Sequence, residues 1–441
     1  LKDLTISIKT KDTVGNLLQE WLKAWFQYTE VDFMENNNSQ TFPDFHLNRH
    51  NLKEVAIIRE DNYRVDSGNS QTVDFGNIDD PEVQNGLIEE FLKTNSTAPD
   101  DIIEKVKKII EYVKDSFEWN GFYGKYSAQS PKNLINKKVG NSAEINLFLI
   151  ALLREADIEV SPVILSTRNH GKIPTDYPFD HFTNYVIALV NTASPFLADA
   201  TEKFLPFDKI PTRCLNDEGL VVNEDDQPKW ITLENNTIST SRHSINMKLD
   251  LVNMDVKANV SIQKTEYESY ISRKEFENDT NKMKNHYAEK SSDITSIKTT
   301  GYDNIDTPYI INFKIDYKTD KLGDSIIIAP FLNLPLSKNT LTQKTRSYPV
   351  DFLYQWEDQF ECLLEIPEGF SLVDIPKNYN LNNDLANIKL AYEVDKNILK
   401  VSGSYKFNKA IYMANEYTRI QYYFDQIIKY FNQMIMLEKD E

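Results

Sequence analysis

The chain has 441 residues and a formal net charge of −18, from 49 basic and 67 acidic side chains. At roughly 150 residues per domain, this length predicts about three domains. An acidic surface repels phosphate backbones, so we expect no nucleic-acid partner. The sequence contains no stretch of about 18 apolar residues, which excludes a transmembrane helix.

Cofactor and metal chemistry find little support in the sequence. Cys214 and Cys362 are too far apart for a disulfide framework or a zinc motif, and each is predicted to be a small buried hydrophobic residue. Six histidines without clustered ligands disfavour a metal site. The glycine-rich nucleotide motifs are missing, so we expect no cofactor.

The first part of the chain, residues 1–95, is predicted to be an N-terminal β-rich domain that is incomplete. Strand-like runs occur at residues 4–8 and 55–58. A helix is expected next, with apolar residues at helical spacing from Ile102 to Phe117 and Thr97 as its N-cap.

Residues 96–221 are predicted to form an α+β domain. A second helix opens near Ser142 and is apolar on nearly every side over residues 145–153, so we expect it to be buried at the centre of the domain. Three strands are predicted after it: Val160–Leu165, Tyr185–Val190 and Phe196–Ala198. This order indicates a helix packed on an antiparallel sheet.

Residues 222–441 alternate between apolar and polar side chains in many short runs, which predicts a C-terminal β-sandwich region. A helical interruption is expected at residues 272–291. A closing helix is expected at residues 415–433, with a buried aromatic stripe.

The buried helix carries a family resemblance. Gly140-Asn141-Ser142 opens it, and Ala-Leu-Leu-Arg at residues 151–154 lies near its end. This pattern resembles the transglutaminase-like superfamily, in which a Gly-x-Cys turn opens the central helix of a papain-like core. Residues 117–124 and 348–352 resemble a branch from Gram-negative bacteria. The resemblance implies an α+β multidomain protein whose transglutaminase-like core is flanked by β-sandwich domains of unknown function.

The same resemblance assigns three triad positions, and the first two can be placed at once. Ser142 stands where the family has its cysteine nucleophile. A helix dipole favours a thiolate but cannot by itself ionise a serine, whose pKa is far higher. Asp199 matches the carboxylate that orients the catalytic base. Ser142 could instead be an ordinary first-turn residue, and Asp199 could cap a turn through Thr201.

The position of the base has two possible registers. In one, His181 takes the role; in the other, which we favour, Tyr185 does, because the expected apolar run begins there. A neutral tyrosine, with an ordinary pKa near 10, is a poor base at pH 7. His181 and His170 both lie beside a predicted loop, and packed or solvated histidines are the alternative reading for each.

These residues support three hypotheses. The first is a non-catalytic protein, a pseudoenzyme that binds a peptide or protein in the degenerate cleft or serves as a scaffold. The alternative is a hydrolase or acyl-transferase of the cysteine-protease or transglutaminase type that uses Ser142, His181 and Asp199. In the third, the β-domains carry the binding surface, which a cleft filled by side chains would favour. The resemblance also implies a periplasmic or cell-surface location in a Gram-negative bacterium, and the oligomeric state is not indicated.

Overall fold

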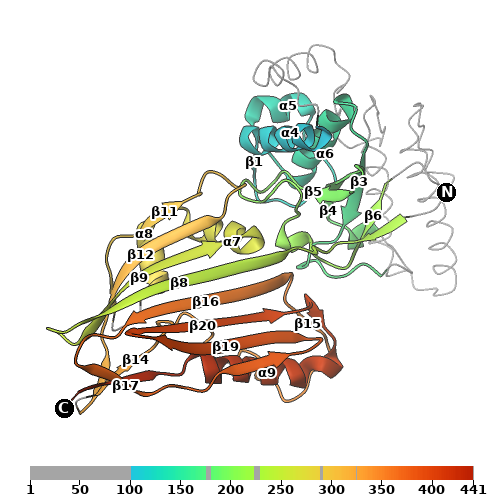
Figure 1. The fold of residues 1–441 in the computed structure, drawn as a ribbon. Coiled ribbons are helices and arrows are strands. Elements are labelled where there is room, and N and C mark those ends of the chain that lie inside the picture. The colour runs from blue at the N-terminus through green and yellow to red at the C-terminus, as the bar shows by residue number, and fades with distance from the viewer. Residues whose placement is uncertain (1–100, 175–179, 223–228, 289–291, 324, 441) are drawn as a thin grey trace, which may run out of the picture. The chain divides into compact units, whose positions relative to one another are not determined.

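The computed structural model describes residues 101–441 apart from 175–179, 223–228, 289–291, 324 and 441 (Figure 1). The predicted N-terminal domain, residues 1–95, lies outside the described residues. The chain divides into two compact units, with the boundary between Glu234 and Asn235. We call the described residues up to 234 the first unit and those from 235 the second unit.

Three helices of the first unit are α4 (Ile102–Ser116), α5 (Pro131–Lys137) and α6 (Ser142–Glu155). The cap predicted for α4 at Thr97 is wrong. Asp101 is the N-cap, because its short carboxylate accepts a hydrogen bond from the amide of Ile103 at 2.9 Å. The helix therefore begins closer to its apolar stripe than expected.

The helix α6 begins at Ser142, as predicted, and its start is fixed by a capping box. Asn141 accepts from the amide of Glu144 at 2.9 Å, and Glu144 Oε2 accepts from the amide of Asn141 at 2.8 Å. The residue before the cap must be small. A Cβ at Gly140 would lie 2.7 Å from Leu134 Cδ1 and 2.8 Å from Glu144 Oε2.

An antiparallel sheet lies beside α6, with the strand order β5-β4-β3-β6-β7. Its strands are β3 (Val160–Leu165), β4 (Tyr185–Val190), β5 (Phe196–Ala198), β6 (Glu218–Val221) and β7 (Lys229–Thr232). The first three have the predicted bounds. Every residue of β4 is buried, which agrees with its continuous apolar run. Because β7 pairs with β6, the sheet continues beyond residue 221, where the sequence placed the end of this domain.

Short elements complete the first unit and position its polar residues. The strands β1 (Glu118–Trp119) and β2 (Val139–Gly140) pair in parallel. The 3₁₀ turns are η2 (Asp180–Phe182) and η3 (Thr212–Cys214). The described residues of the first unit thus form a helix packed on an antiparallel sheet, as the sequence predicted.

The second unit is built on a nine-stranded sheet with the path β10-β12-β9-β8-β16-β20-β19-β18, to which β11 adds at β12. Its strands are β8 (Ile238–Asp250), β9 (Asp255–Lys264), β10 (Ser292–Ile294), β11 (Lys298–Thr300), β12 (Tyr309–Tyr317), β16 (Gln355–Glu365), β18 (Tyr379–Asn382), β19 (Ala386–Asp395) and β20 (Ile398–Phe407). Within this described sheet the pairing is antiparallel except between β8 and β16. Two antiparallel halves are therefore joined at one parallel seam.

A smaller sheet has the order β13-β14-β22-β17, and β15 (Val350–Asp351) pairs with β21 (Ile411–Tyr412). The strands of the smaller sheet are β13 (Asp320–Leu322), β14 (Ser325–Ile328), β17 (Phe370–Asp374) and β22 (Ile435–Lys439). The helices are α7 (Glu266–Phe276), α8 (Thr280–Tyr287) and α9 (Tyr417–Phe431), with the 3₁₀ turn η4 (Ala414–Glu416). The expected helical interruption is thus two helices, and the closing helix is followed by a strand.

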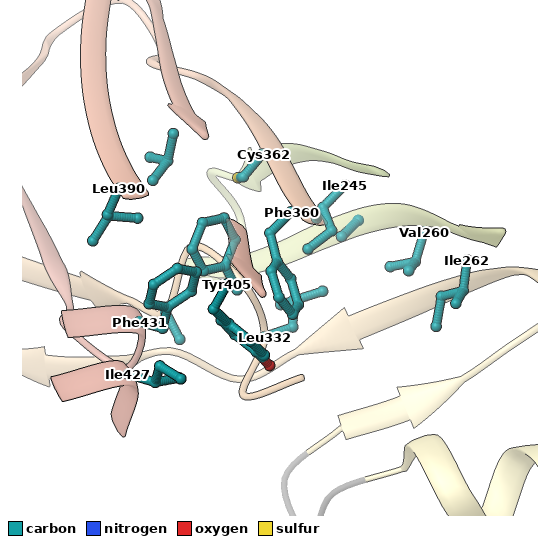
Figure 2. Close-up of a cluster of buried hydrophobic side chains, with 14 of the residues drawn as sticks. Ile245, Val260, Ile262, Leu332, Phe360, Cys362, Leu390, Tyr405, Ile427 and Phe431 are labelled. Atoms are coloured by element: carbon teal, nitrogen blue, oxygen red, sulfur yellow. The ribbon is translucent and has the colours of Figure 1, made fainter. Parts of the chain in front are cut away.

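One hydrophobic core joins the large sheet, the smaller sheet and α9 (Figure 2). The rings of Tyr405 and Phe431 meet edge to face at 5.0 Å, and Cys362 is fully buried among apolar side chains. Gly403 allows α9 to approach, because a Cβ there would lie 2.6 Å from Phe431 Cε1. The β-rich C-terminal region is confirmed. None of the described helices is both long and apolar enough to cross a membrane.

Arg273 is a buried cation held by carbonyl groups. It lies on α7 with 1% of its surface exposed. Its Nη2 donates to the carbonyls of Gly301 at 2.6 Å, Asn304 at 3.0 Å and Thr307 at 2.9 Å. These bonds fix the loop that leads into β12.

We predict that Arg273→Met lowers the free energy of unfolding by about 3 kcal/mol or more, because three loop carbonyls lose their buried donor. The matched control is Lys274→Met, at the exposed neighbouring position, where a change within about 0.5 kcal/mol is expected. Calorimetric melting of the full chain measures both. Equal melting temperatures for the two variants would contradict the prediction.

Candidate functional site

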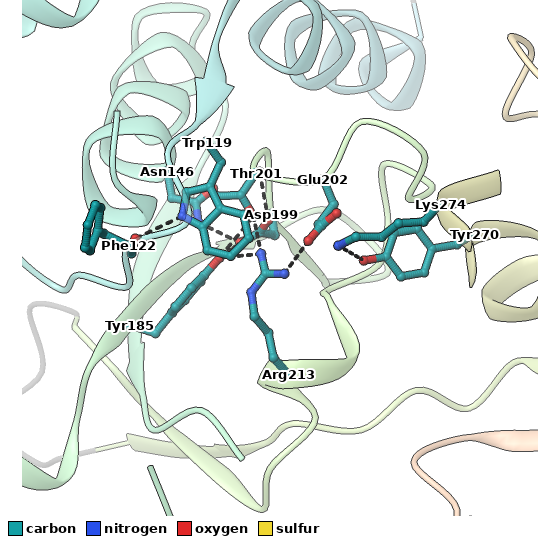
Figure 3. Close-up of polar contacts among 10 residues, drawn as sticks. All are labelled: Trp119, Phe122, Asn146, Tyr185, Asp199, Thr201, Glu202, Arg213, Tyr270 and Lys274. Atoms are coloured by element: carbon teal, nitrogen blue, oxygen red, sulfur yellow. Dashed lines mark hydrogen bonds and ion pairs between the residues drawn. The ribbon is translucent and has the colours of Figure 1, made fainter. Parts of the chain in front are cut away.

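The carboxylate of Asp199 is the centre of a buried polar network in the first unit (Figure 3). Asn146 Nδ2 donates to Asp199 Oδ2 at 2.7 Å, and the Tyr185 hydroxyl donates to the same oxygen at 3.0 Å. The other oxygen accepts from the amide of Thr201 at 2.8 Å and from its hydroxyl. Both carboxylate oxygens are therefore fully engaged.

Tyr185, the first residue of β4, occupies the position beside Asp199. Its side chain is fully buried, and its hydroxyl lies 3.0 Å from Thr201 Oγ1 as well as from Asp199. Burial, followed by the nearby Asp199 charge, raises the pKa of Tyr185 well above its ordinary value. The phenol therefore stays protonated at neutral pH.

Arg213, from η3, closes the network on the other side of Tyr185. Its Nη2 donates to the Tyr185 hydroxyl at 3.0 Å and to Thr201 Oγ1 at 2.6 Å, and its Nη1 forms an ion pair with Glu202. The guanidinium lies 4.1 Å from the centre of the Trp119 ring, a cation–π contact. Burial alone would lower the pKa of Arg213, but the acidic groups of Tyr185, Asp199, Cys214 and Glu202 outweigh it and the pKa is raised.

Asn146 ties the central helix to the sheet. It lies one turn after Ser142 on α6 and is fully buried. Its Nδ2 also donates to the carbonyl of Val186 at 2.9 Å, and its Oδ1 accepts from the amide of Ala200 at 2.8 Å. A single amide in an otherwise apolar helix was a signal that the sequence analysis missed, because a buried amide needs partners. Arg213 gave no comparable signal.

Ser142 is fully buried, and its hydroxyl is used by the backbone of Gly124. The hydroxyl donates to the Gly124 carbonyl at 3.0 Å and accepts from the Gly124 amide at 2.8 Å. The amide of Ser142 donates to the carbonyl of Phe122 at 3.2 Å. Ser142 therefore fastens a neighbouring segment to the start of α6, as a first-turn residue can.

That segment, residues 122–129, is here called the strap. Further contacts hold it. Asn141 Nδ2 donates to the Tyr126 carbonyl at 3.1 Å, and Glu144 Oε1 accepts from the Ala128 amide at 2.8 Å. Lys125 forms a buried ion pair of 2.6 Å with Asp180. Together with Ser142, these contacts keep the strap over the first turn of α6.

His181 lies in η2, next to Asp180, which pairs with Lys125 of the strap. Its side chain is exposed, its ring lies 4.3 Å from that of Phe182, and its carbonyl is 2.6 Å from His170 Nε2. Within the described part of the chain, the hydrogen bonds of Ser142 and Asp199 do not include His181. The structure thus joins Tyr185 to Asp199 by a hydrogen bond, while the Ser142 hydroxyl bonds to Gly124 and the His181 carbonyl to His170.

Cys214, next to Arg213, is a free thiol near the same network. It is fully buried. Burial and the Asp199 charge raise the pKa of this thiol well above its ordinary value. A protonated, inaccessible thiol does not replace a catalytic cysteine. The described residues also contain no group of three or more His, Cys, Asp or Glu side chains placed to hold a metal ion.

Three parts of the chain match models of known protein families. Residues 90–195 match the model of the transglutaminase-like superfamily, and residues 324–437 match a domain of unknown function with a solved structure, DUF3858. The part from residue 90 to 195 is thus a transglutaminase-like domain. A solved structure of a candidate protease from Parabacteroides distasonis is 10% identical with a TM-score of 0.46, covering 82% of this chain and 56% of that one.

Residues 1–84 match the model of the NgoBV restriction endonuclease, which the sequence analysis did not anticipate. The type II restriction enzyme NgoBV of Neisseria gonorrhoeae is 47% identical over 49 residues, which cover 11% of this chain and 28% of the enzyme. The type II enzyme NlaIV of Neisseria lactamica is also 47% identical over 49 residues, 20% of its length. The chain therefore spans about a quarter of these relatives.

Lys114, on α4, should make the stability of the protein depend on pH. It is 6% exposed, and its Nζ donates to the carbonyl of Leu205 at 2.6 Å. Burial, partly offset by Asp199, lowers the pKa of Lys114 from 10.5 to about 8. Between these two values the unfolded chain binds more protons than the folded one. The contribution of Lys114 to stability should therefore rise as the pH increases from about 8 to 10.5.

We predict that the unfolding free energy of the native chain minus that of Lys114→Met increases by up to about 3 kcal/mol over this range. Urea unfolding at several pH values between 7 and 10.5 measures the difference. Lys132→Met, on the exposed surface of α5, is the control and should give a difference that stays flat. A flat difference for Lys114→Met as well would contradict the prediction.

Proposed function

We propose that the protein is a non-catalytic transglutaminase-like protein that acts as a binding or scaffold module. The observation that carries the proposal is the 3.0 Å hydrogen bond between Tyr185 and Asp199. The group that faces the orienting carboxylate is a phenol whose pKa is raised, so it cannot accept a proton from a nucleophile at neutral pH.

The nucleophile position supports the same proposal. Acyl transfer through serine requires a base within hydrogen-bond reach of the hydroxyl, about 2.6–3.2 Å. The Ser142 proton is instead donated to the carbonyl of Gly124, which is not a base. The positive end of the α6 dipole does not lower the pKa of a hydroxyl enough to replace one.

The alternative function is a hydrolase or acyl-transferase that uses Ser142, His181 and Asp199. It would require the strap to leave Ser142, and His181 to displace Tyr185 from Asp199. Both changes break hydrogen bonds of buried groups, each of which costs about 1–3 kcal/mol when left unpaired. The hydrogen-bond pattern therefore favours the non-catalytic function.

The partner we propose is a peptide or protein segment that binds outside the closed cleft. Ser142, Tyr185 and Asp199 are all 0% exposed, so a ligand cannot contact them in this conformation. The strap, in contrast, presents Phe122 with 71% and Tyr123 with 36% of their surfaces exposed.

Stacked side chains support Tyr123. The Tyr123 ring stacks on Trp119 at 5.7 Å and 6°, and Trp119 rests on the guanidinium of Arg213. Trp, Tyr and Arg are the residues that most often dominate the binding energy of protein interfaces. We call Trp119, Phe122 and Tyr123 the aromatic strap surface.

This proposal concerns the described residues and carries over no activity from the restriction enzymes, of which the chain spans only a part. The expected absence of a nucleic-acid partner and the expected periplasmic or cell-surface location stay predictions.

We predict that the purified chain neither cleaves a fluorogenic peptide library nor joins an amine donor to glutamine-containing peptides. The reason is that, among the described residues, no base forms a hydrogen bond with the Ser142 hydroxyl. Native protein, Ser142→Ala and Tyr185→Phe should all give rates equal to buffer. A native rate above buffer that Ser142→Ala abolishes would establish the alternative enzyme.

A cysteine introduced at position 142 tests whether solvent reaches the cleft. Cys214 and Cys362 are both fully buried and should not react in the folded protein, so the reaction of a thiol introduced by Ser142→Cys can be measured separately. It should react with a disulfide reagent only after unfolding in urea. Ser194→Cys, at an exposed position, is the control that should react at once. Rapid reaction at position 142 in the folded protein would show an open cleft.

We predict that linear peptides selected from a 12-residue display library bind the aromatic strap surface. Phe122→Ala with Tyr123→Ala should weaken their binding at least tenfold, because two exposed anchors are removed. Tyr348→Ala is the control, since this tyrosine is 78% exposed in the second unit. Calorimetric titration measures the affinities. Selection of no peptide, or equal affinity for the double variant, would contradict the prediction.

A further inference from the structure

A hollow of about 410 Å³ lies on one face of the large sheet of the second unit. It is lined from four adjacent strands, β8, β16, β20 and β19, and we call it the trough. We propose that the trough binds a neutral oligosaccharide. This site is independent of the transglutaminase-like domain and goes beyond the proposed function.

One cross-strand row forms the middle of the trough. Arg242 on β8 pairs with Gln359 on β16, Gln359 pairs with Ser404 on β20, and Ser404 pairs with Lys389 on β19. Residues in such a row point to the same face of the sheet. At a strand spacing of about 4.8 Å, the row spans about 14 Å. That length accommodates several linked sugar rings.

The depth of the trough comes from small side chains on β20. Ser402 and Ser404 lie between the longer side chains of β16 and that of Lys389 on β19. Gly403, between them, faces the opposite side, where Phe431 packs against it. The strand can therefore keep two short hydroxyl side chains on the open face while its other face remains in the hydrophobic core.

The charges that line the trough balance. Arg242 and Lys389 are basic, whereas Glu357 and Glu361 are acidic. Arg242 Nε donates to Gln359 Oε1 at 3.0 Å, and Glu361 forms an ion pair of 2.8 Å with Lys400. With two charges of each sign, the lining favours a ligand without net charge over a polyanion such as a nucleic acid, which needs an excess of cations.

The lining also argues against a protein partner. Phe360 is 3% exposed and belongs to the core, so the side chains that line the open trough are those of polar and charged residues. Protein interfaces usually have apolar or aromatic anchors at their centre. Hydroxyl, amide, guanidinium and carboxylate groups together supply many donors and acceptors, which a polyhydroxylated ligand can use in full. The volume falls within the range of about 300–1,000 Å³ that is typical of small-ligand sites.

Affinity gel electrophoresis of the full chain tests the proposal. The probes are four neutral polysaccharides, xylan, mixed-linkage β-glucan, galactomannan and soluble starch, with polygalacturonate and heparin as anionic probes. We expect at least one neutral polysaccharide to retard the protein. Ser404→Trp, which fills the trough, should weaken this retardation at least tenfold in terms of Kd.

Lys314→Trp is the matched control, because it places the same bulky ring on an exposed position of β12, away from the trough lining. It should leave the retardation unchanged. Arg242→Ala with Gln359→Ala should reproduce the loss without adding bulk, which guards against misfolding of the tryptophan variant. Retardation by no probe, by the anionic probes alone, or equally for all variants and native protein would overturn the proposal.

Discussion

The first unit depends on satisfying one buried carboxylate. An ionised carboxylate away from water is costly unless hydrogen bonds replace its hydration. Asp199 obtains them from α6 through Asn146, from β4 through Tyr185 and from its own turn through Thr201. Because each donor comes from a different element, the carboxylate fixes how the central helix lies against the sheet. Loss of one donor would leave part of the charge unpaired.

The same requirement bears on the non-catalytic function proposed above. An imidazole and a phenol can each donate one hydrogen bond to a carboxylate, but only the imidazole titrates near neutral pH. Tyr185 therefore donates the hydrogen bond to Asp199 and stays protonated at neutral pH, since burial raises its pKa. At position 142, a hydroxyl forms bonds of 2.8 and 3.0 Å with the backbone of Gly124. Both residues thus serve packing and polar satisfaction in this chain.

The sequence pattern predicted the helices and strands of the first unit well, but it predicted few of the side-chain contacts between them. The helix that begins at Ser142 and the three strands after it were predicted because buried elements contain continuous or periodic runs of apolar residues. The place of Arg213 in the network and the contact of Lys114 with the Leu205 carbonyl were not predicted, because the partners are distant in sequence. The cap of α4 was misplaced because Thr97 and Asp101 are both suitable cap residues.

In the second unit, alternation indicated strands but not their partners. It could not reveal that β8 pairs in parallel with β16, more than a hundred residues later, because a period of two is the same in either direction. That seam joins two antiparallel halves into a sheet broad enough for four strands to line the trough. The Arg242–Gln359 hydrogen bond crosses the seam, so the two halves must pair in register before the row exists. A hollow lined by polar side chains can therefore arise from strand order alone.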